Sequence, residues 1–337
     1  FIEVDHDGSD VTAAQTRMVA AFGGGFSPGG LGDPTITGNF VYMVDIETGE
    51  ILLKEQVTGM VPGDVEALDL DVDGYLDKLY WADTSGRIYS LDLSTPATLD
   101  ANGRIDSWTP TVVFNAGPDQ PFFMRPALVP ISFDAQGNAT VAIAIGSGDR
   151  DNIFEQNATP HRFYVVVDTP GPSGTLTEAD LQGFTNSSPA TSGGQYLIGT
   201  DNYGWYLALT DADAATDDWE KVNTNAVVLM ETVIFSTFNP DTDIQQVPVY
   251  DEAGNEVGIA CRRGGNARTY RVSLYNADVV EGDSRFIQHP PETAMATDPV
   301  VYLGADGRIH VMQALDNLQN QEPVAAMDVP ARITSWK

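Results

Sequence analysis

Cysteine and basic residues are the scarcest groups in this chain of 337 residues. It has one Cys, four His and 17 Lys plus Arg, against 48 Asp plus Glu, for a formal net charge of −31. The single Cys261 excludes an intramolecular disulfide framework, and the four scattered histidines lack the spacing of a zinc site. So few cations cannot form a basic patch, which excludes nucleic acid and anionic membranes as partners.

Long hydrophobic runs are also missing. No segment approaches the roughly 20 apolar residues of a transmembrane helix, and no signal peptide is present, so we expect no membrane insertion. Because the chain starts at Phe1 instead of Met, we expect it to be a mature or excised piece of a longer protein. Charged residues make up only 19% of the chain and hydrophobic residues 42%, a globular composition.

The apolar segments that are present are short, β-branched and aromatic, and they are separated by turn residues. The chain has 32 Gly and 20 Pro, which together with these short runs predict an all-β fold. Helix-like patterning is confined to segments 11–21 and 178–181. We therefore expect only short helical insertions.

One strand pattern recurs along the chain. Its copies, aligned on an aromatic residue or His, are centred on Tyr42, Tyr89, Tyr164, Tyr206, Tyr270 and His310. The shorter gaps between copies, about 40 to 47 residues, match one four-stranded blade. Apolar strands precede several copies, at 78–82, 139–145, 227–235 and 300–303. This radial repetition predicts a modified β-propeller of seven blades, within a range of six to eight, that forms a single domain over residues 1–337.

Segment 69–77 is the strongest chemical motif. Asp69, Asp71, Asp73 and Asp77 occupy positions 1, 3, 5 and 9 of a calcium-binding loop, and Gly74 occupies position 6, where the chain bends. The ligand at position 7 is normally a backbone carbonyl, here that of Tyr75. All of these ligands are oxygen atoms, which favours Ca²⁺.

The ends of this loop exclude a helix–loop–helix site. Such a site needs glutamate at position 12, but Tyr80 stands there, inside a segment that is typical of a strand. The alternative to a metal site is an acidic turn between two strands. Four carboxylates so close together repel one another by a few kcal/mol at an effective dielectric of about 20. That repulsion favours a bound cation.

Several segments, in order along the chain, resemble the PilC/PilY-type tip-associated adhesins of type IV pili. The calcium loop with the two strands after it, 68–93, resembles the calcium-binding blade of that family. The other segments that resemble the family are 22–26, 142–149, 161–168, 203–207, 233–237, 261–265 and 331–336. Segment 5–16 fits the family poorly, and the turn 146–149 lacks the usual basic end. The large N-terminal region of the family is not part of this chain.

The resemblance implies a secreted protein at the tip of a type IV pilus, with the propeller as its C-terminal part. It implies that calcium in the propeller controls pilus extension and retraction, and that the protein supports surface adhesion. Asp69, Asp71, Asp73 and Asp77 would be carboxylate ligands, and Tyr75 a carbonyl ligand. The implied partners are pilins or minor pilins and a host or abiotic surface.

An enzyme of the quinoprotein dehydrogenase type is the alternative function, because those enzymes also use propellers. Their tryptophan-containing blade motif should repeat in nearly every blade. The five tryptophans of this chain share no period: Trp81, Trp108, Trp205, Trp219 and Trp336. Vicinal cysteines are also missing, and no histidine has a local catalytic partner. We therefore expect no enzymatic activity.

Other acidic segments are weaker candidates. The stretch from Asp5 to Asp10 could be a second cation site but lacks the full spacing, and the acidic residues at 211–218 and 241–243 are expected to be exposed loops. Segment 251–256 is typical of a hairpin turn between strands at 247–250 and 257–260.

Overall fold

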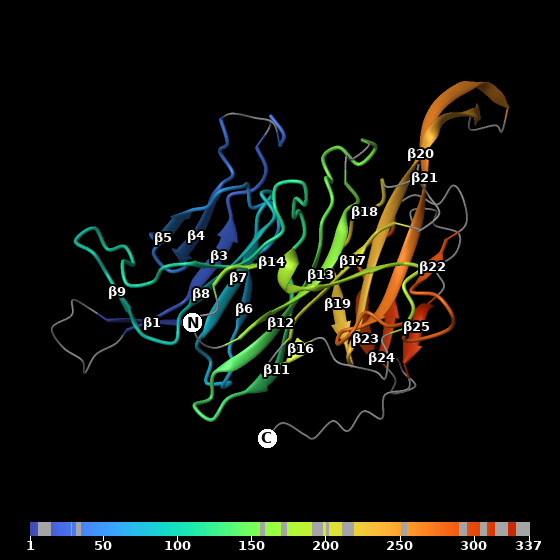
Figure 1. Cartoon of the computed structure of the whole chain (residues 1–337). Helices are drawn as coiled ribbons and strands as arrows, with labels where there is room; N and C mark the ends of the chain where they lie inside the picture. The colour runs from blue at the N-terminus through green and yellow to red at the C-terminus, as the bar shows by residue number, and fades with distance from the viewer. Residues whose placement is uncertain are drawn as a thin grey trace.

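The computed structural model describes residues 1–5, 15–27, 29–31, 35–155, 159–169, 174–190, 198–199, 202–210, 219–250, 255–289, 295–303, 309–313 and 323–327. Within these residues every regular element except one is a β-strand, so the all-β prediction is confirmed (Figure 1). The exception is a single 3₁₀ turn, η1 (Glu178–Asp180), which lies in one of the two segments with helix-like patterning. The described residues contain no helix with the length and hydrophobicity of a transmembrane segment.

The helix-like patterning at 11–21 was misleading. Residues 15–17 and 19–21 of that segment belong to strands β2 and β3, and residues 11–14 lie outside the described residues. Residues 19–23 pair with the next strand over five consecutive positions. This ladder of backbone hydrogen bonds overrides the weak helical spacing of the apolar residues.

The strands form six sheets, which we name in chain order. The N-terminal sheet contains β2 (Gln15–Arg17), β1 (Ile2–Asp5) and β9 (Ala97–Thr98). Sheet A contains β3 (Val19–Gly23), β4 (Phe40–Asp45) and β5 (Ile51–Gln56). Sheet B runs in the order β14 (Leu176–Thr177), β10 (Thr111–Asn115), β8 (Arg87–Asp92), β7 (Lys78–Ala82) and β6 (Glu66–Leu68).

The second half of the chain forms the other three sheets. Sheet C runs β11 (Ala127–Phe133), β12 (Ala139–Gly146), β13 (Arg162–Asp168), β17 (Asn202–Ala208) and β15 (Gln182–Thr185), with β16 (Ile198–Gly199) beside β17. Sheet D contains β18 (Lys221–Val222), β20 (Thr232–Tyr250), β21 (Glu256–Ser273) and β22 (Phe286–Gln288), with β19 (Val227–Leu229) beside β20. Sheet E contains β23 (Val300–Leu303), β24 (Ile309–Met312) and β25 (Pro323–Met327).

Successive sheets pack face to face, and alternate residues of one strand face opposite neighbours. In β7, Leu79 and Trp81 pack with side chains of sheet A, whereas Tyr80 and Ala82 pack with side chains of sheet C. Strand β13 behaves in the same way, because its odd-numbered apolar residues face sheet D and its even-numbered ones face sheet B. The inner strands are therefore buried on both faces, which explains their nearly continuous apolar sequences.

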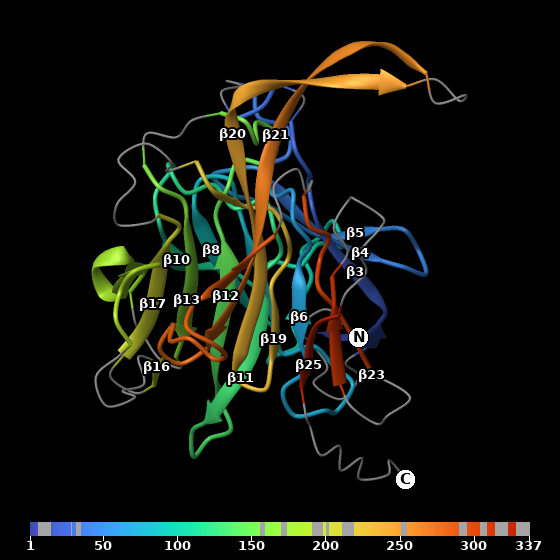
Figure 2. The same ribbon diagram turned by 90° about the vertical axis from the view of Figure 1, so that its right-hand side faces the viewer.

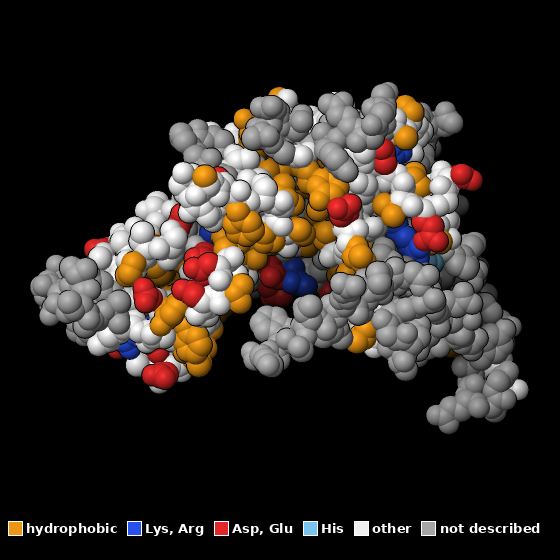
Figure 3. All heavy atoms as spheres, turned by 90° about the horizontal axis from the view of Figure 1, so that it is seen from below, with side chains coloured by type: hydrophobic (Ala, Val, Ile, Leu, Met, Phe, Trp, Pro, Cys, Tyr) orange, Lys and Arg blue, Asp and Glu red, His pale blue; other side chains and the backbone are white. Residues whose placement is uncertain are grey.

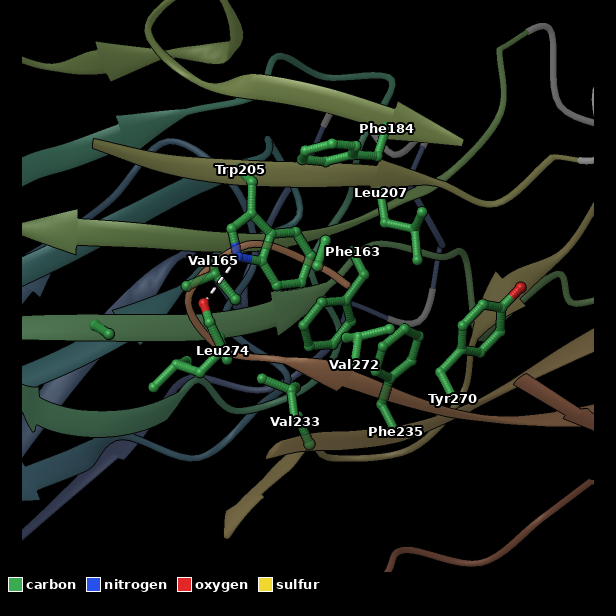
Figure 4. Packing of buried hydrophobic residues seen from close by; sticks show 14 of the residues in the cluster. Phe163, Val165, Phe184, Trp205, Leu207, Val233, Phe235, Tyr270, Val272 and Leu274 are labelled. Atoms are coloured by element: carbon green, nitrogen blue, oxygen red, sulfur yellow. Dashed lines mark hydrogen bonds between the residues drawn. The ribbon is translucent and has the colours of Figure 1, made fainter. Parts of the chain in front are cut away.

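The contact between sheets C and D is built on stacked aromatic rings (Figure 4). Phe235 lies between Phe163 and Tyr270, with ring centroids 3.8 and 4.7 Å away and rings within about 11° of parallel. Beside this stack, Trp205 donates a hydrogen bond from Nε1 to the carbonyl oxygen of Leu274, at 2.8 Å. Its one polar atom is thus satisfied inside an apolar cluster.

Buried carboxylates fix the turns that join the strands. Asp83, which is fully buried, accepts the backbone N–H groups of Gly59, Ser85 and Arg87 and the hydroxyl of Tyr89. Because Gly59 follows sheet A, this carboxylate also ties sheet A to sheet B. Similar local turns form around Asp45, Asp100 and Asp134, each of which accepts two nearby backbone N–H groups.

The recurring aromatic pattern does mark strands, but not one blade for each copy. Tyr42, Tyr89, Tyr164, Tyr206 and Tyr270 lie in β4, β8, β13, β17 and β21, and His310 lies in β24. Tyr164 and Tyr206, however, are direct cross-strand partners in sheet C. The interpretation of their spacing as one whole blade was therefore wrong. The total of seven blades stays a prediction.

Strands β20 and β21 form one long hairpin whose distal part stands clear of the other sheets (Figures 1 and 2). The register shifts between Pro240 and Ile244 and then continues to the pair Tyr250 and Glu256. The expected pairing of 247–250 with 257–260 is confirmed. Seen from below, apolar side chains gather around a hollow in which acidic and basic groups lie together, and further acidic groups are scattered over the face (Figure 3).

We predict that Phe235→Ala lowers the free energy of unfolding by about 3 to 5 kcal/mol, because it leaves a cavity between two stacked rings. The control is Phe133→Ala, whose side chain is exposed and whose replacement should change stability by no more than about 0.5 kcal/mol. Urea titration followed by tryptophan fluorescence measures both variants. Equal midpoints for the two variants would contradict the packing argument.

A second prediction concerns His161, which is almost fully buried and has no hydrogen-bond partner at either ring nitrogen. Burial, with smaller contributions from Lys221 and Arg162, lowers its pKa to about 3. The unfolded chain binds a proton more readily, so this group costs stability as the pH falls below about 6.5. Between pH 7 and 4.5 the loss from this group should be about 2 to 3 kcal/mol. Urea titrations at several pH values should show a shallower acid loss for His161→Leu than for the wild type, and parallel curves would refute it.

Candidate metal centre

The acidic loop connects β6 to β7 in sheet B. Its ends are closed by two bonds: the N–H of Asp77 donates to the carbonyl oxygen of Leu68 at 2.8 Å, and the N–H of Leu70 donates to Oδ2 of Asp77 at 2.5 Å. Leu68 ends β6 and Lys78 begins β7, and the two residues form the cross-strand pair next to the loop. The loop is therefore an inter-strand connection with a strand on each side, as its sequence predicts.

The backbone of the loop turns sharply at two residues. Val72 has φ of 62° and Gly74 has φ of 95°. A Cβ at Gly74 would meet no atom within 4 Å, so glycine is needed there for its backbone conformation and not for lack of space. The predicted role of Gly74 as the bend of the loop agrees with this geometry.

Three of the four predicted carboxylates come together. Asp69, Asp71 and Asp77 each offer a carboxylate oxygen, and these oxygens all lie within 4.8 Å of one another. Calcium binds oxygens at 2.3–2.6 Å, so two ligands on opposite sides of one ion lie about 5 Å apart. The three residues fit a single hard cation. Asp69 and Asp77 are half-buried, and Asp71 is exposed.

Asp73 and Tyr75 take other positions. Asp73 does not belong to the group of three, and its Oδ1 accepts the N–H of Tyr75 at 2.8 Å. The side chain of Tyr75 points to the N-terminal segment, where its hydroxyl bonds Oγ1 of Thr16 at 2.7 Å. The carbonyl oxygen of Tyr75 was the predicted ligand, and that role stays a prediction, as does ligation by Asp73.

Backbone amides hold the loop carboxylates in place. The N–H of Gly74 donates to Oδ2 of Asp69 at 3.0 Å, and the N–H of Asp73 lies 3.2 Å from one oxygen of Asp69 and one of Asp71. These bonds orient the carboxylates before any ion arrives. Less side-chain ordering is then required when a cation binds.

The electrostatics of the loop favour a cation. Burial raises the pKa of Asp77, and the negative charges of Asp71, Asp69 and Asp73 raise it further, whereas the hydrogen bond from Leu70 lowers it. A divalent ion would reverse this balance by stabilising the ionised carboxylates.

The loop is fastened to two other parts of the molecule. The N–H of Leu76 donates to the carbonyl oxygen of Phe1 at 2.9 Å, next to β1. The N–H of Leu93, just after β8, donates to the carbonyl oxygen of Asp77 at 2.8 Å. With the contact between Tyr75 and Thr16, these bonds join the loop to the N-terminal sheet and to the end of β8.

A polar cleft of about 420 Å³ opens beside the loop. Asp71 and Asp77 line one part of it, and Lys78, Asp92 and Asp168 line the rest together with several hydroxyl groups. Sequence reasoning missed Asp92 and Asp168 as site residues. Asp168 lies in a different sheet, and no local spacing connects it to the loop.

The remaining sequence candidates do not form a second site among the described residues. Residues 6–10 lie outside the described residues, so the second cation site stays untested. His161 is buried, His289 bonds Oγ1 of Thr269 at 2.8 Å, and His310 stacks on Tyr302. Ser147, in the turn 146–149, is fully buried.

No protein-family model matches the chain, and no curated protein matches it. Its structure is similar to the C-terminal domain of PilY1 from Pseudomonas aeruginosa, with a TM-score of 0.59 and 15% identity over 89% of this chain and 67% of that one. A weaker likeness, to BamB from Moraxella catarrhalis, has a TM-score of 0.29 and 12% identity over 87% and 83% of the two chains. The likeness to PilY1 confirms the expected resemblance at the level of the fold: this chain has the modified β-propeller fold of the PilY1 C-terminal domain.

Proposed function

We propose that this chain is the calcium-binding propeller of a protein associated with the tip of a type IV pilus, and that it acts as a binding and assembly module. The observation that carries the proposal is the convergence of the Asp69, Asp71 and Asp77 carboxylates within 4.8 Å in one inter-strand loop. The fold shared with the PilY1 C-terminal domain supports the pilus part of the proposal.

Calcium suits this loop better than other metals. The converging groups are hard carboxylate oxygens, and thiolate or imidazole ligands, which zinc prefers, are absent from the group. Because Asp71 is exposed and Asp69 and Asp77 are half-buried, water can reach the site, and calcium accepts water molecules as additional ligands. Mg²⁺ demands a stricter octahedral geometry at shorter distances and loses its water reluctantly.

Bound calcium would stiffen the blade instead of opening it. The loop joins two antiparallel strands and is bonded to the N-terminal segment at Phe1 and to Leu93 after β8. An ion that draws three carboxylates together would lock these four segments against one another. Calcium occupancy would thus set the rigidity of this face and, through it, pilus extension and retraction.

The proposal places the protein outside the cell, at the pilus tip, with pilins or minor pilins and a host or abiotic surface as partners. The net charge of −31 suits a basic or calcium-bridged contact and opposes an acidic one. No observation among the described residues favours the alternative, a quinoprotein-type enzyme.

We predict that Asp71→Asn weakens calcium binding at least tenfold, because it removes one of three converging charges from an exposed position where the fold should tolerate the change. Calorimetric titration of the decalcified chain measures the affinity. Asp100→Asn is the matched control, since it removes one charge from an exposed turn outside the loop and should bind calcium as the wild type does. Asp73→Asn should have a smaller effect than Asp71→Asn. Undiminished binding by Asp71→Asn would sink the site assignment.

The pilus part of the proposal has a separate test. The full protein, carrying an epitope tag in its native cell, should be found in sheared pilus fractions and should be lost from them when the major pilin is deleted. In cells with the Asp71→Asn variant the amount of sheared pili should change, but the protein should still be found in the pili that are sheared, because calcium is proposed to control the pilus and not the fold. A protein that is absent from sheared pili of wild-type cells would refute the pilus assignment.

A further inference from the structure

The cleft beside the calcium loop lies between two adjacent sheets. One side comes from sheet B, where Lys78 begins β7 and Asp92 ends β8 as its cross-strand partner. The other side comes from sheet C, where β12 begins and β13 ends at Asp168. Its volume of about 420 Å³ lies in the range of small-ligand sites.

The charges that line the cleft are unbalanced. Four carboxylates, those of Asp71, Asp77, Asp92 and Asp168, face one ammonium group, that of Lys78. The surplus of three negative charges within a chain of net charge −31 excludes an anionic ligand. Between a neutral and a cationic ligand, this field favours the cation.

Lys78 shows how the cleft holds an ammonium group. Its Nζ lies 3.2 Å from Oδ2 of Asp168, and the same oxygen accepts the hydroxyl of the fully buried Tyr80 at 2.7 Å. Both of these bonds use Oδ2. Asp168 lines the cleft, and neither of these two bonds uses its other carboxylate oxygen, Oδ1.

Asp92 supplies the second carboxylate at this end of the cleft. It is exposed, and its Oδ1 accepts the N–H and the hydroxyl of Ser94 at 2.9 and 2.6 Å. Burial raises the pKa of Tyr80, and the charges of Asp168 and Asp92 raise it further, so both carboxylates act on one hydroxyl. The hydroxyls of Ser90 and Thr111, 3.2 Å apart, add hydrogen-bonding groups to the lining.

We propose that this cleft binds an ammonium or guanidinium group, carried by a free polyamine or by a basic side chain of a partner protein, and that this cation and the calcium of the loop oppose each other's binding. The second half rests on the proposed calcium function. Asp71 and Asp77 belong both to the loop and to the lining of the cleft, so a calcium ion there removes part of the field that attracts the organic cation.

The opposition must be mutual. If calcium lowers the affinity for the organic cation by some factor, the cation lowers the affinity for calcium by the same factor. A divalent and a monovalent charge about 8 Å apart in a water-like dielectric repel by an amount that corresponds to about a fivefold change in affinity. A partner with a basic side chain would thereby sense, and change, the calcium occupancy of the blade.

The first experiment tests the cleft without calcium. Spermidine and an acetylated trilysine amide are titrated calorimetrically into the decalcified 337-residue chain at 150 mM NaCl, which screens the general field of the protein. Saturable binding of either probe is expected, and the probe that binds more tightly identifies the source of the cation. Asp92→Asn should weaken that binding about fivefold, whereas Asp100→Asn, with the same change of charge in an exposed turn outside the cleft, should change it less than twofold.

Two results would overturn the cleft proposal. One is that neither probe saturates. The other is that Asp92→Asn and Asp100→Asn weaken binding equally, because the probes would then follow the net charge of the protein and not the cleft.

The second experiment tests the opposition to calcium. At low ionic strength, where these charges are little screened, calcium at a concentration that saturates the wild type should lower its affinity for spermidine about fivefold. This effect should be much smaller at the same calcium concentration in Asp69→Asn, because Asp69 belongs to the loop but does not line the cleft. If calcium binds the loop and spermidine affinity stays constant, the opposition is refuted. If calcium does not bind but Asp92→Asn still weakens spermidine binding, the proposed calcium function fails and the cleft proposal stands.

Discussion

The structure depends on the packing of each sheet against both of its neighbours through alternate side chains of the same strands. Tyr80 and Trp81 are adjacent in sequence and fully buried, yet they belong to different interfaces. Side chains in these strands must be apolar on both faces, and each fully buried aromatic or aliphatic group contributes roughly 1.5 to 3 kcal/mol relative to its exposed state. Polar side chains on these strands are tolerated where a partner is at hand, as at the fully buried Ser236 of β20, whose hydroxyl bonds that of Thr269 at 2.9 Å.

This constraint decides where chemistry can occur. The faces of the inner sheets are occupied by the core, so charged groups gather at the ends of strands and in the loops between them. The acidic loop leaves sheet B at the end of β6, and the cleft is formed where β8 and β13 end and where β7 and β12 begin. Carboxylates that are far apart in the sequence meet there because the ends and the starts of neighbouring antiparallel strands alternate along the same rim.

The acidic loop could be predicted from sequence because its information is local. The spacing of Asp69, Asp71 and Asp77 and the bend at Gly74 depend only on nine successive residues, and the structure brings these three carboxylates together and bends the chain at Gly74. Even so, the spacing did not distinguish Asp73 from the other three carboxylates, because the direction of a side chain depends on hydrogen bonds such as the one from Tyr75.

Long-range pairing was beyond such reasoning. Tyr164 and Tyr206 share a pattern, but only the return of the chain after β13 makes them neighbours in one sheet. The same limit hid Asp168, which meets Lys78 across two sheets. The length of the β20–β21 hairpin could not be predicted from the sequence either. Pro240 is a residue typical of turns, and yet it lies inside β20.

The bond between Leu76 and Phe1 has a mechanical consequence. Strand β1 pairs with β2 on one side and, in parallel, with the two-residue β9 on the other, so only a few backbone bonds hold it in the N-terminal sheet. A tension applied at Phe1 would pass directly into the acidic loop through Leu76, and next through Asp77 into Leu93. A cation bound in the loop, as proposed above, would stiffen this path, and pulling the first strand away would then need more force.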